Sequence, residues 1–366
     1  MSHRGISRVA FKIITASTAL FTASLLAACN SETPTVTTPP DVEDTTPVEL
    51  TFVAYGGTGQ DGMIKSWQQP YTAKYPYVTF VNSSPPDAAQ VKAQVQAGVV
   101  QWDLVSTAPW LASQNCGTIY EKLDIPDLDT SQFGPGVLGE CYIPDFAYSL
   151  VFAYNAEKWP DPATAPKSIK DFFDTKKFPG KRGVVPALQD GLLEWALMAD
   201  GVTPDKVYPV DVPRALAKWD SIRADTTWAA NVGALLQLVT SRQVDMQIMV
   251  QARNQAALDA GAKIVPVWDI TMTSVDGMAI PKGSPHKAAA ERFMSFILKP
   301  EQQTAMAEAV GVAPSNLLSK PNYTENGNKI NTFGPANTGR SVPVDAKWWG
   351  QNWNQISAEF TKWLNV

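Results

Sequence analysis

The chain has 366 residues, its formal net charge is −5, and 18% of its residues are charged. This mildly acidic composition offers no basic surface for nucleic acid. The histidines are His3 and His286 and the cysteines are Cys29, Cys116 and Cys141, too few for a zinc site built from these residue types. No Walker loop or dinucleotide-binding GxGxxG motif follows a predicted strand. We therefore expect neither a metal nor a cofactor.

The first 28 residues have the pattern of a secretory signal. Arg4, Arg8 and Lys12 precede an apolar stretch that runs to Ala28 and is short for a membrane-spanning helix. The stretch ends in Leu-Ala-Ala-Cys, which resembles the lipobox of bacterial lipoproteins, where the cysteine is lipidated. We predict a signal peptide over 1–28, a lipid anchor on Cys29, and an exported protein held in the periplasm or on the outer face of the cytoplasmic membrane.

Residues 29–47 are predicted to form a disordered tether. Thr, Pro, Asp and Glu dominate this segment, and such a composition cannot bury enough apolar surface to offset the entropy lost on ordering. The remaining chain is long enough for two packed lobes rather than a single core.

From Val48 onward, predicted strands alternate with predicted helices. Pro86 and Asp87 start a helix that Gly98 ends, and Ser168 is a predicted N-cap. The alternation predicts βαβ units and a parallel sheet. The predicted strands are 48–55, 77–83, 102–107, 148–155, 182–187, 244–250 and 263–268, and the clearest helical patterns are 60–74, 86–97, 169–174, 192–200, 212–224, 252–261, 286–298 and 300–310.

Four strand-to-helix junctions carry polar or glycine residues. Ligands collect at such junctions because unpaired backbone N–H groups point there, so together they predict a cleft between two lobes. The junctions are Gly56-Gly57-Thr58, Ser106-Thr107, Gln189-Asp190 and Gln251–Arg253.

Cys116 and Cys141 form an even pair in an exported protein. A disulfide is the default in that compartment, and by the loop-entropy argument it stabilises the fold by roughly 3.5 kcal/mol. Two separate buried thiols are the alternative.

Five segments together resemble the polyamine-type (spermidine/putrescine-like) family of ABC-transporter solute-binding proteins, in the branch with Gly-Gly after the first strand. The segments are YGGTGQD, ECYIPDFAYSLVFAYN, DFFDTKKFPGKRG, LLEWALMADGVTPDKVY and VDGMAIPKGSPHKAAAERFMSFIL. The resemblance implies an α/β, two-lobed periplasmic-binding-protein fold of type II, with two inter-lobe strands, a ligand cleft and hinge closure. It assigns 48–152 and 277–366 to lobe 1 and 153–276 to lobe 2.

The resemblance also implies where a ligand binds. Asp276 matches a position where the family places a carboxylate against an amine, and Asp190 lies near a second acidic position. Tryptophans expected in the family are replaced by Gly56-Gly57-Thr58, Val250 and Ser274. Ligand contacts are predicted for Gly57, Thr58, Ser106, Thr107, Tyr148, Asp190, Arg253, Trp268 and Asp276.

Arg253 matches an arginine of the Gly-Gly branch and suits a carboxylate. With Asp276 it indicates a zwitterion, such as an amino acid or its conjugate, as readily as a polyamine.

We therefore predict a binding protein without enzymatic activity, a monomer that delivers an amine-containing solute to an ABC permease and its ATPase. Two alternatives remain open from the sequence. One is a secreted hydrolase that uses Asp190 and Asp276, since His286 begins a surface helix and is not expected to act in catalysis. The other is a ligand-sensing lipoprotein without transport.

Overall fold

The computed structural model describes residues 45–134, 137–334 and 341–365. The segment Thr45–Val366 forms a compact unit by itself. Within the described ranges, no helix is both long and apolar enough to cross a bilayer. The predicted signal, Cys29 and nearly all of the tether lie outside the described residues, so the lipid anchor stays a prediction.

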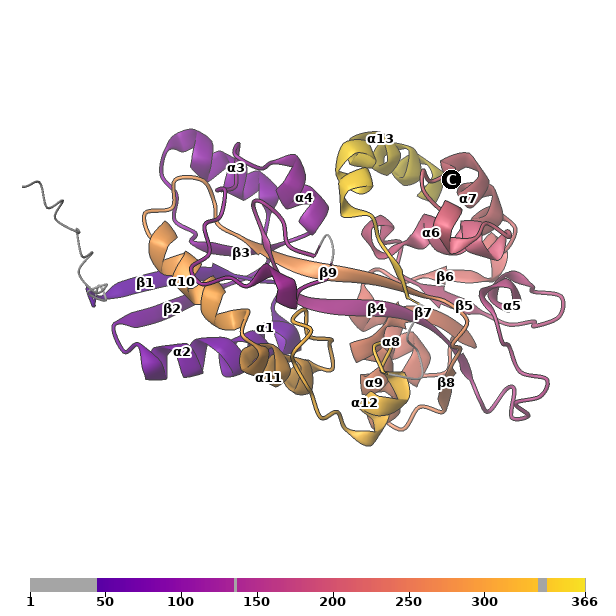
Figure 1. Cartoon of the computed structure of the whole chain (residues 1–366). Coiled ribbons are helices and arrows are strands. Elements are labelled where there is room, and N and C mark those ends of the chain that lie inside the picture. Colours follow the sequence, from indigo (N-terminus) through magenta and orange to yellow (C-terminus); the bar gives the residue numbers. More distant parts are fainter. Residues whose placement is uncertain (1–44, 135–136, 335–340, 366) are drawn as a thin grey trace, which may run out of the picture. The chain divides into compact units, whose positions relative to one another are not determined.

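Ten strands of the described chain form one sheet, in the order β2-β1-β3-β9-β4-β7-β5-β6, with β10 beside β9 and β8 beside β4 (Figure 1). The strands are β1 (Val48–Val53), β2 (Val78–Ser83), β3 (Leu104–Thr107), β4 (Ile143–Asn155), β5 (Arg182–Val184), β6 (Thr226–Trp228), β7 (Met246–Val250), β8 (Ile264–Pro266), β9 (Thr271–Ala279) and β10 (Ser341–Pro343).

Two long strands connect the two halves of this sheet. β1 runs parallel to β2 and β3 in one half, and β5 runs parallel to β6 and β7 in the other. Between them β4 and β9 pair antiparallel and pass from one lobe to the other (Figure 1). The structure therefore confirms the predicted α/β, two-lobed fold with two inter-lobe strands.

The first lobe packs helices around β1, β2 and β3. Its core contains Phe52, Trp67 and Phe293, and the Trp67 indole N–H donates to the carbonyl of Gln302 (3.1 Å). The Asp87 carboxylate caps the predicted helix, which ends at the left-handed Gly98 (φ 68°). The helices are α1 (Gly57–Met63), a π-helical segment (Ile64–Gln68), α2 (Gln69–Lys74), α3 (Ala88–Ala97), α4 (Pro109–Gln114), α10 (Lys287–Ile297) and α11 (Pro300–Val310).

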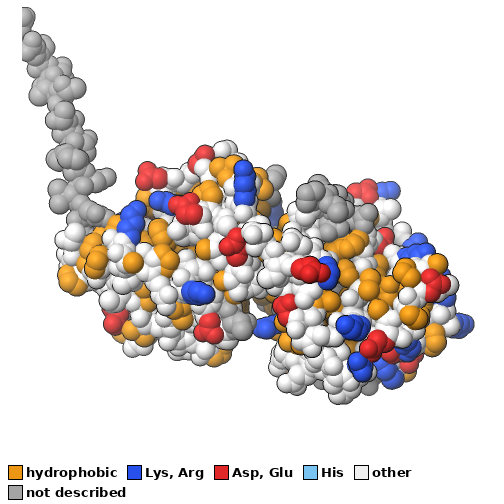
Figure 2. All heavy atoms as spheres, turned by 90° about the horizontal axis from the view of Figure 1, so that it is seen from below, with side chains coloured by type: hydrophobic (Ala, Val, Ile, Leu, Met, Phe, Trp, Pro, Cys, Tyr) orange, Lys and Arg blue, Asp and Glu red, His pale blue; other side chains and the backbone are white. Residues whose placement is uncertain are grey.

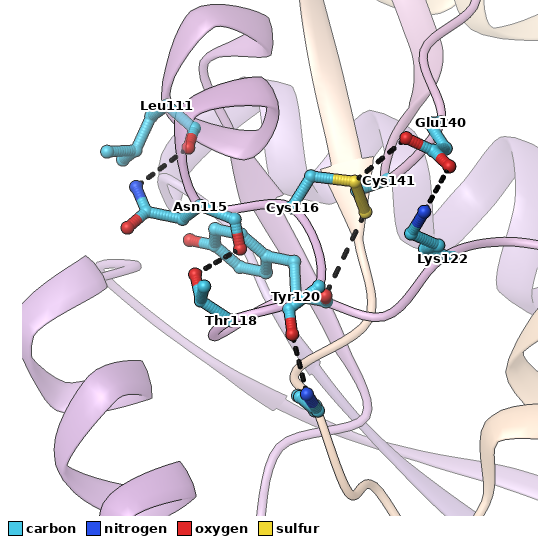
Figure 3. Close-up of a disulfide and its surroundings, with 10 residues drawn as sticks. Leu111, Asn115, Cys116, Thr118, Tyr120, Lys122, Glu140 and Cys141 are labelled. Atoms are coloured by element: carbon cyan, nitrogen blue, oxygen red, sulfur yellow. Dashed lines mark hydrogen bonds and ion pairs between the residues drawn. A yellow bond between two sulfur atoms is a disulfide. The ribbon is translucent and has the colours of Figure 1, made fainter.

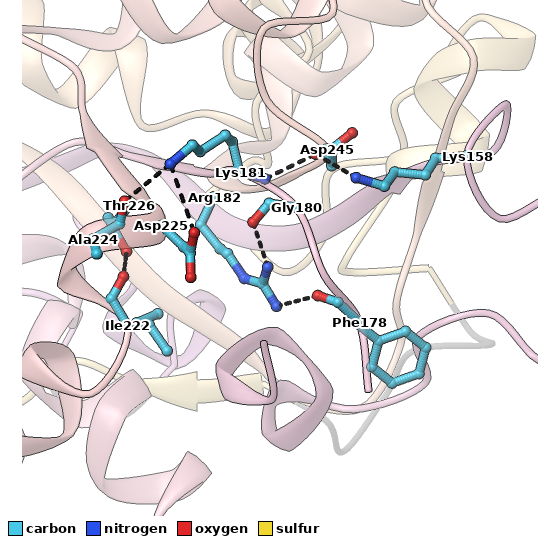
Figure 4. Close-up of polar contacts among 10 residues, drawn as sticks. All are labelled: Lys158, Phe178, Gly180, Lys181, Arg182, Ile222, Ala224, Asp225, Thr226 and Asp245. Carbon is cyan, nitrogen blue, oxygen red and sulfur yellow. Dashed lines mark hydrogen bonds and ion pairs between the residues drawn. The ribbon is translucent and has the colours of Figure 1, made fainter. Parts of the chain in front are cut away.

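The second lobe packs helices around β5, β6 and β7. Its helices are α5 (Ile169–Phe173), α6 (Leu192–Ala199), α7 (Val212–Asp220), α8 (Val232–Thr240) and α9 (Gln251–Asp259). The predicted cap Ser168 forms a capping box with Asp171. The buried Arg182 guanidinium donates to the carbonyls of Phe172, Gly180 and Phe178, and the last two contacts are drawn in Figure 4. These neutral acceptors satisfy the cation's donors without a buried carboxylate.

The end of the chain packs on the second lobe. This part comprises α12 (Glu325–Ile330), β10 and α13 (Ala346–Leu364). β10 pairs with β9 beside Thr271, and Trp349, Ile356 and Phe360 join the second lobe's core. The sequence analysis assigned 277–366 to lobe 1. The apolar face of α13 joins the core that contains residues of α6 and α7, and α13 also packs on α4 of the first lobe, so the assigned lobe bounds stay a prediction.

A disulfide closes one side of the first lobe (Figure 3). It joins Cys116, just after α4, to Cys141, just before β4, with a Cα–Cα distance of 5.4 Å. Cys141 is buried, and its sulfur lies 3.8 Å from the carbonyl oxygen of Tyr120. Lys122 and Glu140 form an exposed ion pair beside it. The bond ties the loop after α4 to the start of the inter-lobe strand β4.

Candidate functional site

A cleft of about 1160 Å³ lies where β4 and β9 pass between the lobes. Its floor comes from both strands, and its walls come from α4 of the first lobe and from the start of α13. Polar groups, aromatic rings and aliphatic side chains all line it. The lining includes Tyr55, Trp110, Tyr142, Phe146, Tyr148, Asp190, Tyr208, Ser274, Asp276, Lys347 and Trp353.

Two carboxylates and a tyrosine come together in this cleft. The Tyr148 hydroxyl donates to Asp190 Oδ1 at 2.9 Å. Burial raises the pKa of the Tyr148 hydroxyl, and Asp190 and then Asp276, which also lies nearby, raise it further. Tyr148 lies on the inter-lobe strand β4, Asp276 lies on the inter-lobe strand β9, and Asp190 belongs to the second lobe. We call these three residues the acidic group.

The strand pairing explains why Tyr148 and Asp276 face the cleft together. Tyr148 is opposite Ser274, and Phe146 is opposite Asp276, so these four side chains project from the same face of the antiparallel pair. After Asp276, Gly277 pairs with Thr107 of β3, and a Cβ at Gly277 would lie 3.0 Å from the Thr107 carbonyl oxygen. A larger residue there would push β9 from β3 and displace Asp276.

Asp190 reaches the cleft from a short 3₁₀ turn, Leu188–Asp190, between β5 and α6. The next residue, Gly191, has a left-handed backbone (φ 77°), and a Cβ there would lie 2.8 Å from the Met272 side chain. Glycine is needed for both the backbone angle and the close approach to β9. The turn therefore places Asp190 directly above the inter-lobe strands.

The electrostatics of the acidic group favour a cation. Burial and, to a smaller extent, Asp190 raise the pKa of Asp276 to about 7, although the hydrogen bond from the backbone N–H of Gly277 lowers it. Burial raises the pKa of Asp190 to about 6, against the lowering effect of the Tyr148 hydrogen bond. Among the described residues, neither carboxylate takes part in an ion pair. A bound ammonium would stabilise the ionised form of both.

Aromatic rings surround the acidic group. Tyr142, Phe146 and Tyr208 line the cleft, and Tyr55, at 58% exposure, stands at its first-lobe side. Sequence reasoning missed these rings and also Trp110 and Trp353. Tyr55 directly precedes the Gly-Gly junction, which was a usable signal. Tyr208 and Trp353 follow no strand-to-helix junction and had no local signal.

The remaining predicted contacts lie outside the lining of this cleft. Ser106 and Thr107 are buried in β3, at 1% and 3% exposure. Gly57 and Thr58 begin α1, Arg253 lies in the first turn of α9, and Trp268 follows β8, where it is partly buried. The structure thus brings together Tyr148, Asp190 and Asp276, and the other predicted residues are not part of this group. Their contact with ligand stays a prediction.

In the part of the chain that the structure describes, no three His, Cys, Asp or Glu side chains are arranged to hold a metal ion. On the face shown in Figure 2, acidic and basic side chains are interspersed over the surface of both lobes.

Comparison with known proteins assigns the chain to a family. The model of the bacterial extracellular solute-binding protein family matches residues 32–331. A gamma-aminobutyric acid-binding protein of Pseudomonas aeruginosa is 29% identical over 321 residues, which cover 86% of this chain and 90% of the relative.

Solved structures of related binding proteins have the same fold as this chain. The structure of a GABA receptor has a TM-score of 0.79 and 31% identity, covering 86% of this chain and 97% of its own. The binding protein MotA of A. tumefaciens, solved with glucopine, has a TM-score of 0.75 and 29% identity over 86% of this chain and 99% of its own. The binding protein AgtB of A. tumefaciens, solved with agropinic acid, has a TM-score of 0.74 and 26% identity, covering 87% of this chain and 99% of its own. The chain therefore belongs to the bacterial extracellular solute-binding protein family.

Proposed function

We propose that this protein is the substrate-binding component of an ABC importer and that it captures a small amino-acid-like solute through its ammonium group. The acidic group of Tyr148, Asp190 and Asp276 carries this proposal. Two carboxylates without a cationic partner in the described residues form the most polar part of an otherwise largely aromatic and aliphatic cleft. An ammonium placed between them would replace water as their hydrogen-bond donor.

The aromatic lining suits the same ligand. Rings of Tyr55, Tyr142 and Phe146 surround the carboxylates, and aromatic faces attract a cation that has lost part of its hydration. They also exclude water, and the electrostatic attraction between ammonium and carboxylate is stronger in such an environment.

An amino-acid-like ligand is favoured over a polyamine by the second charge. Two of the relatives are named for γ-aminobutyric acid and one was solved with agropinic acid, so each of these ligands carries an acid group. In this chain Arg253, in the first turn of α9, forms no ion pair with any described residue. We propose that cleft closure brings Arg253 to the ligand's carboxylate. A polyamine has no anionic group that could pair with Arg253.

Binding by closure fits a protein with one site shared between two lobes. Tyr148 and Asp276 lie on the inter-lobe strands and Asp190 on the second lobe, so a ligand that contacts all three favours the arrangement in which they converge. The closed form would then be recognised by the permease. We further propose that a lipid on Cys29 keeps the protein near that permease, joined by the tether.

A thermal-shift screen tests the ligand class. γ-Aminobutyric acid, α-amino acids, amino-acid conjugates, putrescine and spermidine are each added to the purified protein. A ligand at 100 times its dissociation constant stabilises the fold by about 2.7 kcal/mol. We expect stabilisation by compounds that carry both an ammonium and a carboxylate. Stabilisation by polyamines alone would contradict the role of Arg253, and a response to none of these amines would contradict the role of the acidic group.

A further inference from the structure

A third carboxyl group lies next to the acidic group but out of contact with solvent. Asp145 in β4 is 0% exposed. One of its oxygens, Oδ1, accepts the backbone N–H of Phe146 at 2.7 Å. The other, Oδ2, has no hydrogen-bond partner among the described residues. A buried carboxylate oxygen without a partner costs several kcal/mol if it is charged, so this residue needs an explanation beyond packing.

A bulge in β4 places Asp145 beside Asp276. Pro144 pairs with Gly277, but Phe146 pairs with Asp276, so Asp145 is an extra residue in this strand. Such bulges bring an additional side chain to a position that regular pairing would not give it, and they are frequent next to functional sites. Phe146 and Asp276 both line the cleft, whereas Asp145 is buried and close enough to Asp276 to interact with it electrostatically.

Buried polar contacts hold the bulge in this shape. The Gln303 amide of α11 donates to the Asp145 carbonyl at 2.8 Å, and the Ser315 hydroxyl donates to the Pro144 carbonyl at 3.4 Å. Gln303 also accepts the Ser315 backbone N–H at 2.9 Å. The first lobe therefore pairs the backbone carbonyls of Pro144 and Asp145, while one side-chain oxygen of Asp145 has no partner among the described residues.

The groups that face Asp145 are acidic or neutral. Asp276 comes from β9 and Tyr55 from the segment after β1, while α11 contributes the neutral Gln303. Among the described residues Asp145 forms no ion pair. Burial raises the pKa of Asp145 well above its ordinary value, and the nearby Asp276 raises it further. Repulsion between a buried Asp145 carboxylate and the Asp276 carboxylate disfavours the ionisation of both groups at once.

We propose that Asp145 is a positioning residue of the ligand site, which stays protonated behind Asp276 and keeps Asp276 the single anion at this point of the cleft. This inference rests on the proposed function, since it assigns Asp276 to the ligand's ammonium. The neutral carboxyl of Asp145 still accepts the Phe146 N–H through Oδ1, which holds the bulge opposite Asp276, whereas a second carboxylate there would repel Asp276. The residue therefore helps to hold the anion in place without touching the ligand.

Thermal unfolding of the ligand-free protein tests the protonation. Because the pKa of Asp145 is raised in the folded state, its contribution to stability is full below the pKa of the unfolded chain and is lost as the pH rises toward the folded pKa. Asp145→Asn removes this dependence. From pH 5 to pH 8 the Tm of the wild type should therefore fall by about 2 °C per pH unit relative to the Asn variant. Asp61→Asn, at an exposed carboxylate in α1, is the matched control and should follow the wild type.

Calorimetry with γ-aminobutyrate at pH 7 tests the positioning. Asparagine keeps both a donor and an acceptor, so Asp145→Asn should bind within about threefold of the wild type, whereas Asp145→Leu should lose at least about tenfold, the effect of one lost hydrogen bond. Equal losses in both variants would overturn the proposal, because they would show that the charge of Asp145 is needed.

If the Tm of the wild type and the Tm of Asp145→Asn changed with pH in the same way, the proposal would be wrong as well. This comparison can be made even if Asp145→Leu does not fold. If no amine binds the wild type, the proposed function fails, but the Tm profiles still decide the protonation of Asp145.

Discussion

The indole rings of Trp110 and Trp353 stack across the cleft, with centroids 3.8 Å apart and an angle of 22° between their planes. Trp110 belongs to α4 of the first lobe, and Trp353 belongs to α13, which is fixed to the second lobe. The fixing contact is a hydrogen bond from the Trp349 indole N–H to the buried Glu194 carboxylate at 2.8 Å. Gly350 packs on the backbone of Trp110, where a Cβ would lie 3.1 Å from its carbonyl oxygen. This stack is therefore a contact between the lobes at the cleft.

Trp353→Ala should favour separation of the lobes. An aromatic pair contributes about 0.5–1.5 kcal/mol beyond its buried area, so ligand affinity should fall up to about tenfold if closure depends on the stack. Small-angle scattering would measure the radius of gyration with and without ligand. Trp363→Ala is the matched control, since Trp363 lies in the same helix but contacts Arg223 and Trp228 of the second lobe. The same scattering from both variants would exclude a role of the stack in closure.

Asp276→Asn should weaken binding of any ammonium ligand at least roughly thirtyfold. Removing one partner of a desolvated charged pair costs about 2–5 kcal/mol. Arg253→Gln should cause a similar loss for γ-aminobutyrate but none for putrescine, because a polyamine gains nothing from a nearby guanidinium. Calorimetry with both compounds on both variants separates the ligand classes. Unchanged affinity in both variants would show that the ligand binds elsewhere.

Ligand affinity should depend on pH between 5 and 8. The ammonium binds the ionised forms of Asp276 and Asp190, whose pKa values are raised to about 7 and about 6. Affinity should therefore rise at least roughly tenfold from pH 5 to pH 7 and change little above pH 8. The ligand-free protein should show the opposite trend, because groups with raised pKa values lose their contribution to stability as the pH increases through 6 and 7. Asp276→Asn should make both profiles less steep, with the part due to Asp190 remaining.

Removing the disulfide should lower the free energy of unfolding by roughly 3.5 kcal/mol, as expected for a loop closed by residues 25 positions apart. Denaturant unfolding of a Cys116→Ser, Cys141→Ser double variant would measure the loss. Peptide mapping without reductant should recover the two cysteines as one linked pair. Two alkylatable thiols in protein purified without reductant would show instead that the pair is reduced.

Cys29→Ser should release the protein from the membrane fraction. The prediction depends on the Leu-Ala-Ala-Cys sequence that precedes the tether. Membrane sedimentation of wild type and variant, followed by immunodetection, would measure the release. Continued sedimentation of the variant with membranes would place the anchor elsewhere.

Local patterns in the sequence were sufficient to predict most of the helices and strands. Asp87 and Gly98 bound a helix, and Ser168 caps another, because capping uses neighbouring residues. The alternation of strands and helices predicted the parallel α/β units, because each element has its own local pattern, and the chain length predicted two lobes. The sequence analysis did not name β9 as a strand from its pattern, since its face toward the cleft is polar at Ser274 and Asp276, nor did it predict α8 or α13.

Tertiary structure alone decided which distant residues share the cleft. Tyr148 and Asp276 meet because β4 and β9 pair in one register, which a shift by one residue would reverse. Asp190 joins them because Gly191 allows the close approach to Met272. Trp353 reaches Trp110 because α13 is anchored on α6 by Trp349, a contact over more than 150 positions. Asp145 becomes buried beside Asp276 through a bulge, and no local pattern encodes a bulge, because it depends on the partner strand.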